Sequence, residues 1–124
     1  MKTLETRQKS DPFLLACAAI PAAGLAAFYS FVVRAWLELG AWPKPNLPDP
    51  KDLGFEVHYI SSFLFLIAAL LSPLALALCL FVRQAVPMRG RSAGKALVLF
   101  FSSYVALCGL FIGDPGALFA WFAD

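Results

Sequence analysis

Acidic side chains are missing from the three longest apolar runs of this sequence. No Asp or Glu occurs within residues 13–37, 59–82 or 96–112. Carriers that are coupled to protons or cations normally need an ionisable group at membrane depth, so the commonest transport mechanism lacks its central residue. Charged residues make up only 15% of the whole chain, whereas about 25% is typical of soluble domains. The composition therefore argues against a soluble protein and against an ion-coupled carrier.

Histidine and cysteine are scarce and scattered. His58 is the only histidine, and Cys17, Cys79 and Cys108 lie in different apolar runs with no C-x-x-C or C-x-x-C-H spacing. One histidine cannot supply a bis-histidine haem or a metal site, and the cysteines lack the spacing of zinc, redox and haem motifs. No nucleophile elbow or phosphate-binding loop is present. We therefore expect no enzyme, no catalytic residue, no metal and no cofactor.

Long apolar runs dominate what is present, since hydrophobic residues make up 60% of the chain. At about 1.5 Å per residue, helices of this length cross or nearly cross a hydrocarbon layer of about 30 Å. The pattern predicts a single all-α membrane domain, residues 1–124, with three transmembrane helices at about 12–38, 57–83 and 94–113. A signal peptide is the alternative for the first run, but its length of 25 residues exceeds the about 7–15 apolar residues that a signal sequence carries.

Positive charges lie mainly at two segments that an odd number of spans places on one side of the membrane. These segments are the tail 1–10 and the loop 84–93 with its flanks, and their basic residues are Lys2, Arg7, Lys9, Arg83, Arg89, Arg91 and Lys95. Because Lys and Arg of short loops stay in the cytoplasm, we expect a multi-pass protein of the plasma or inner membrane with a cytoplasmic N-terminus and an external or periplasmic C-terminus. The tryptophans Trp36, Trp42 and Trp121 then mark the external headgroup layer.

The expected external loop, residues 39–56, is rich in proline. Proline fixes φ and favours an extended strand that loses little entropy on docking. The loop is either a partner-contact surface or a stiff connection between two helix ends, and its candidate contact residues are Trp42, Pro43, Pro45, Pro48 and Pro50. Asp49-Pro50 resembles a helix start, which predicts a short interfacial helix through Phe55 or an entry into the second span.

The external tail, residues 114–124, begins with the helix breaker Gly113-Asp114-Pro115-Gly116. The apolar and aromatic residues that follow predict a short helix lying in the membrane interface. A kinked continuation of the third span is the alternative.

Two prolines lie inside predicted spans. Pro21 and Pro73 each remove a backbone hydrogen bond, so we expect kinks there, either as fixed features or as hinges.

Cys17 and Cys79 fall at similar depth, about one turn from the cytoplasmic end of their predicted spans. The two cysteines can therefore contact each other, but we expect no disulfide between them on the reducing, cytoplasmic side of the membrane.

Small residues recur at helical spacing in two of the spans, and such faces let helix backbones approach closely in lipid. The candidate packing residues are Ala19, Ala23 and Ala27 in the first span and Ser102, Ala106, Gly109 and Gly113 in the third. The spacing does not distinguish packing within one chain from packing between chains.

Three polar residues are candidates for an ionic site. Arg34 lies near the external end of the first span and either extends to the interface, pairs with Glu38 or Asp114, or binds an anionic ligand. His58, at the start of the second span, is expected to be an interfacial hydrogen-bonding residue, with pH sensing or pigment binding as alternatives.

The function that these features favour is a non-catalytic accessory or assembly subunit. Its expected partners are membrane lipid and either other membrane-protein subunits or further copies of itself, and the net charge of +2 gives no indication of nucleic-acid binding. The alternative is a small homo-oligomeric transporter or channel component in which Pro21 and Pro73 are moving parts.

Overall fold

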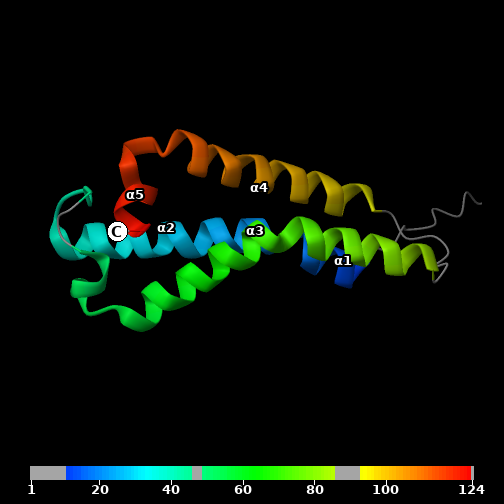
Figure 1. Ribbon diagram of the computed structural model, residues 1–124, viewed down its shortest axis with the longest axis horizontal. Coiled ribbons are helices and arrows are strands. Elements are labelled where there is room, and N and C mark those ends of the chain that lie inside the picture. Colours follow the sequence, from blue (N-terminus) through cyan, green and yellow to red (C-terminus); the bar gives the residue numbers. More distant parts are fainter. Residues whose placement is uncertain (1–10, 46–48, 86–92, 124) are drawn as a thin grey trace, which may run out of the picture.

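The computed structural model describes residues 11–45, 49–85 and 93–123, and this part of the chain is helical without β-strands (Figure 1). The elements are α1 (Pro12–Ala18), α2 (Ile20–Leu39), the 3₁₀ turn η1 (Pro50–Leu53), α3 (Glu56–Ala85), α4 (Gly94–Gly113), the 3₁₀ turn η2 (Pro115–Ala117) and α5 (Leu118–Ala123). Three of them, α2, α3 and α4, are long and apolar enough to cross a membrane. The all-α class and the three candidate spans are therefore confirmed.

The first predicted span is divided into two helices near its start. Asp11 caps α1, because its carboxylate accepts a hydrogen bond from the Phe13 amide, and Pro12 occupies the first helical position. The helix ends at Ala18, and α2 begins at Ile20 with Pro21 in its first turn. Proline cannot donate to the carbonyl four residues earlier, so the break falls beside Pro21.

Pro73 lies inside α3, which changes direction near its middle (Figure 1). Without an amide hydrogen, Pro73 leaves the carbonyl of Ala69 without its usual helical donor. The hydroxyl of Ser72, a fully buried residue, donates to that same carbonyl. The neighbouring side chain therefore satisfies the acceptor that the proline leaves open, as membrane helices require.

The helix α2 packs against both α3 and α4, which lie on opposite sides of it in the half of the molecule that contains α5 (Figure 1). The helices α2 and α3 approach each other closely at Gly24, where an added Cβ would lie 2.5 Å from the Cβ of Ala69 and 3.0 Å from the carbonyl oxygen of Phe65. One turn further along, the hydroxyl of Ser62 donates to the carbonyl of Ala27 at 3.0 Å. Glycine and serine thus fix where the two helices cross.

Buried apolar residues form two separate clusters along the length of the bundle. The first cluster joins α2, the first half of α3, the end of α4, and α5, and consists of Phe28, Phe31, Val32, Ala35, Leu66, Ala69, Leu107, Leu110, Leu118, Trp121 and Phe122. The second joins α1, the second half of α3 and the start of α4, and consists of Leu14, Ala18, Leu76, Ala96 and Phe100. The α1–α2 break and Pro73 thus separate two packing units.

The short helix predicted after the third span is present as α5, but it folds back between α2 and α4 (Figure 1). Trp121 and Phe122 are 0% exposed, and the Trp121 ring stacks on Phe31 with centroids 5.9 Å apart. Trp121 therefore belongs to the core, which corrects its interpretation as a headgroup-layer residue. The reason is the reversal of the chain at Asp114 and Gly116, both of which have positive φ.

Candidate functional site

The small-residue face of α4, defined as Ser102, Ala106, Gly109 and Gly113, is exposed along its whole length. Apart from the backbone of α4 itself and the neighbouring residues, no atom of the described residues lies within 4 Å of the position that a Cβ would take at Gly109 or Gly113. The buried face of the same helix consists of Ala96, Phe100, Ser103, Leu107 and Leu110. At 3.6 residues per turn the two faces lie roughly 110° apart. The glycines are therefore not used for packing within the described part of the chain.

The remaining side of α4 carries large apolar side chains. Val98, Val105 and Ile112 follow one another at seven-residue spacing and are 70%, 68% and 88% exposed. Such a surface suits lipid chains. The small-residue face thus lies between a buried seam and an apolar outer surface.

The alanines of the first predicted span have a different environment. Ala19, Ala23 and Ala27 are half-buried, whereas Gly24 is buried and lies close to α3. Gly24 belongs to the buried set of α2, namely Pro21, Gly24, Phe28, Phe31, Val32 and Ala35. Its spacing of three and four residues to Pro21 and Phe28 is the signal by which the sequence could have identified this glycine.

The structure brings Arg34 and His58 together, one from α2 and one from α3. The guanidinium carbon of Arg34 lies 3.8 Å from the centroid of the Phe55 ring, which is a cation–π contact. Arg34 Nη1 is 3.5 Å from His58 Nδ1, and Ser30 Oγ is 3.0 Å from His58 Nε2. Ser30 donates its own hydroxyl hydrogen to the carbonyl of Ala27 at 2.7 Å.

The donor and acceptor roles at the two ring nitrogens depend on the tautomer of His58. The imidazole of His58 thus lies between the hydroxyl of Ser30 and the guanidinium of Arg34, and neither of these groups is a carboxylate.

Asp114 has a separate, structural role. Its two carboxylate oxygens accept hydrogen bonds from the amides of Phe119 and Ala120, at 2.6 and 2.9 Å. Within residues 11–45, 49–85 and 93–123, no ion pair joins Arg34 to Asp114 or to Glu38. The same part of the chain contains no cluster of three or more His, Cys, Asp or Glu that could hold a metal ion.

The proline-rich loop is partly covered by the protein itself. Pro43 and Pro50 are buried, whereas Trp42 and Pro45 are exposed and Pro48 lies outside the described residues. The Trp42 ring stacks on Trp36 with centroids 5.6 Å apart. Asp49 accepts a hydrogen bond from the Lys51 amide and so starts η1, the short turn expected before the second span. The buried rings of Pro43 and Pro50 are not available to a partner.

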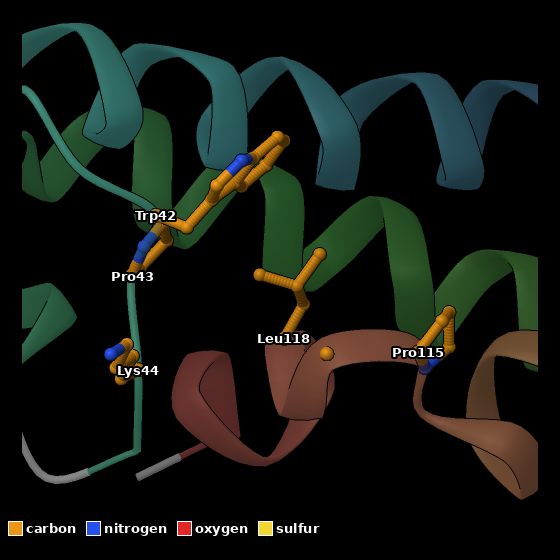
Figure 2. Close-up of a pocket in the computed structure, with 6 residues that line it drawn as sticks. Trp42, Pro43, Lys44, Pro115 and Leu118 are labelled. Carbon is orange, nitrogen blue, oxygen red and sulfur yellow. The ribbon is translucent and has the colours of Figure 1, made fainter.

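The loop and the η2 turn enclose a cavity of about 350 Å³ (Figure 2). It is open to the surface, and its lining residues are Trp42, Pro43, Lys44, Pro115, Gly116 and Leu118. Among the lining residues that the structure describes, Lys44 carries the one charge. The other described residues of the lining are apolar, so the cavity combines an apolar surface with the amine of Lys44.

Cys17 and Cys79 also meet, as their expected depth allowed. Their Sγ atoms lie 2.9 Å apart, and both thiols are free. Cys108, on α4, is a third free and half-buried thiol.

Comparison with protein-family models, with curated proteins and with solved structures gave no match. The interpretation of these sites therefore depends on the geometry of the chain itself.

Proposed function

We propose that this protein is a non-catalytic subunit that assembles in a membrane through the small-residue face of α4. The observation that carries the proposal is the open space above Gly109 and Gly113, which the packing of the described residues does not use. In lipid, apolar burial gives little preference for helix association, and close backbone approach at small residues supplies the contact energy instead. The occupant of this face is a helix of another membrane subunit or of a second copy.

The polar side chains of the described residues support a structural role. The hydroxyls of Ser30, Ser62, Ser72 and Ser103 donate to backbone carbonyls. His58 contacts Ser30 and Arg34, and neither of these is the carboxylate that usually orients a catalytic histidine. Ser102, on the small-residue face, donates only to its own helix at Leu99, so this hydroxyl can also bond across an interface.

The test is to measure assembly after filling the face. The double substitution Gly109→Leu and Gly113→Leu places large side chains where the isolated chain has room for them, so the fold is expected to remain intact. The matched control is Val105→Leu and Ile112→Leu on the adjacent exposed surface. Each tagged variant is extracted in mild detergent, its mass is measured, and the co-purifying polypeptides are identified.

We expect the wild type and the control to retain their partner or oligomer, and the glycine variant to lose it by about tenfold in yield, equivalent to about 1.4 kcal/mol. Unchanged assembly of the glycine variant, with unchanged helical content, would refute the proposal. A homogeneous homo-oligomer that passes solute in liposomes would favour the channel or transporter function over the accessory role.

A further inference from the structure

The thiols of Cys17 and Cys79 form a close pair that two different helices bring together. They are separated by 62 positions in the sequence, yet their Sγ atoms lie 2.9 Å apart in a half-buried position. Packing of α1 against α3 creates this approach. Neither the assembly face of α4 nor the Arg34–His58 cluster uses these cysteines.

The pair lies where a covalent bond would join two otherwise separate pieces of the bundle. Cys17 belongs to α1, which has only seven residues and is separated from α2 by the break at Ala19. Cys79 lies in the half of α3 beyond Pro73 and packs against the second core cluster. A bond between them would fasten α1 to α3 independently of apolar packing.

We propose that Cys17 and Cys79 are a reversible disulfide site that reacts with low-molecular-weight disulfides. One thiolate attacks a sulfur of the reagent, forms a mixed disulfide and expels the first reagent thiolate. The second cysteine, as a thiolate, attacks the protein sulfur of that mixed disulfide, forms the Cys17–Cys79 bond and expels the second reagent thiolate. The two protein thiols lose two electrons and two protons, and the reagent disulfide takes them up to become two thiols.

Both thiols are free in the structure. The end of the bundle that holds both cysteines is the end near the N-terminal tail and the basic 84–93 loop, for which the sequence predicts a cytoplasmic location. A cytoplasmic thiol pool keeps such a pair as dithiol. The bond then forms when disulfides such as glutathione disulfide accumulate, and it opens again when they are reduced.

The experiment uses the full chain in membranes and again in detergent, treated with dithiodipyridine, a small permeant disulfide. Intact mass and peptide mapping follow the three cysteines, with Cys108 as the internal reference for a lone thiol. The variants are Cys17→Ser, Cys79→Ser and, as the matched control, Cys108→Ser.

We expect the wild type to lose two hydrogens at Cys17 and Cys79 without gaining a pyridylthio group there, and dithiothreitol to reverse the change. In Cys17→Ser and in Cys79→Ser, the remaining partner should retain a stable pyridylthio adduct, because no neighbouring thiol displaces it. The Cys108→Ser variant should behave as the wild type does at the pair. Stable adducts on both Cys17 and Cys79 of the wild type, disulfides between chains, or two unmodified thiols in detergent would each overturn the proposal.

Discussion

At the scale of single residues, two glycines of this chain have opposite environments. Gly24 lies at the crossing of α2 and α3, where an added Cβ would lie 2.5 Å from the rigid Cβ of Ala69. At Gly109, no atom from another helix or loop of the described structure lies within 4 Å of the same position. Gly24 thus permits the short distance between α2 and α3, whereas Gly109 leaves a face of α4 open.

We predict that Gly24→Ala destabilises the protein, because the helices must separate to admit the methyl group. The expected loss is about 1–3 kcal/mol of unfolding free energy, which is typical of overpacking. The measurement is unfolding of the purified protein in mixed micelles, followed by circular dichroism. The control Gly109→Ala adds the same methyl group in open space and should leave stability unchanged or raise it slightly. Equal effects of the two changes would contradict the close approach at Gly24.

At the scale of elements, helix positions followed from the sequence more readily than helix faces. Apolar run length, the Asp11-Pro12 cap and Pro21 predicted where α1, α2, α3 and α4 begin or break. The buried face of α4 could not be predicted, because this helix is apolar on nearly every side. The 3.6-residue period then does not indicate which side packs against the rest of the protein. The small-residue pattern identified a face, and the structure shows that intramolecular packing uses another one.

The position of α5 could not be predicted from the sequence either. The composition of these six residues does not distinguish a helix in the membrane interface from one in the core of the bundle, because both environments favour Trp and Phe. The outcome depends on the gap between α2 and α4, which is a property of the assembled bundle. The capping of α5 by Asp114 illustrates this, because the carboxylate reaches amides five and six residues away only after the chain has reversed.

We predict that Trp121→Ala lowers stability far more than Trp42→Ala. Trp121 is 0% exposed and contacts the core cluster of α2 and α4, whereas Trp42 is 58% exposed and stacks on Trp36 at the surface. Removing a buried aromatic ring costs about 3–5 kcal/mol, mainly through the cavity that it leaves. Thermal unfolding of the two variants in the same detergent compares them directly. A larger effect of Trp42→Ala would show that α5 does not pack in the core.

At the scale of the whole molecule, the two core clusters and the charge distribution divide the bundle in the same way. The cluster around Leu14, Leu76 and Phe100 lies at the end that adjoins the basic tail and loop. The cluster around Phe31 and Trp121 lies at the end that carries η1, η2 and α5. The length and hydropathy of the three spans could be predicted from the sequence. The division into two packing units could not, because it depends on where α2 and α3 cross at Gly24 and on the return of α5 into the bundle.

The charge distribution makes a prediction about orientation. A reporter enzyme that is active only outside the cytoplasm should be active when fused after Asp124 and inactive when inserted after Gly90, because Lys and Arg near the 84–93 loop oppose translocation. Replacing Arg89 and Arg91 with Ala should reduce the fraction of correctly oriented chains several-fold, and replacing Lys44 and Lys51 on the opposite side should not.

Protease treatment of intact cells offers a second measurement of orientation, in which residues 1–10 should stay protected. A reporter active after Gly90 and inactive after Asp124 would mean the reverse orientation, and the Cys17–Cys79 pair would then face the external side, where disulfides persist.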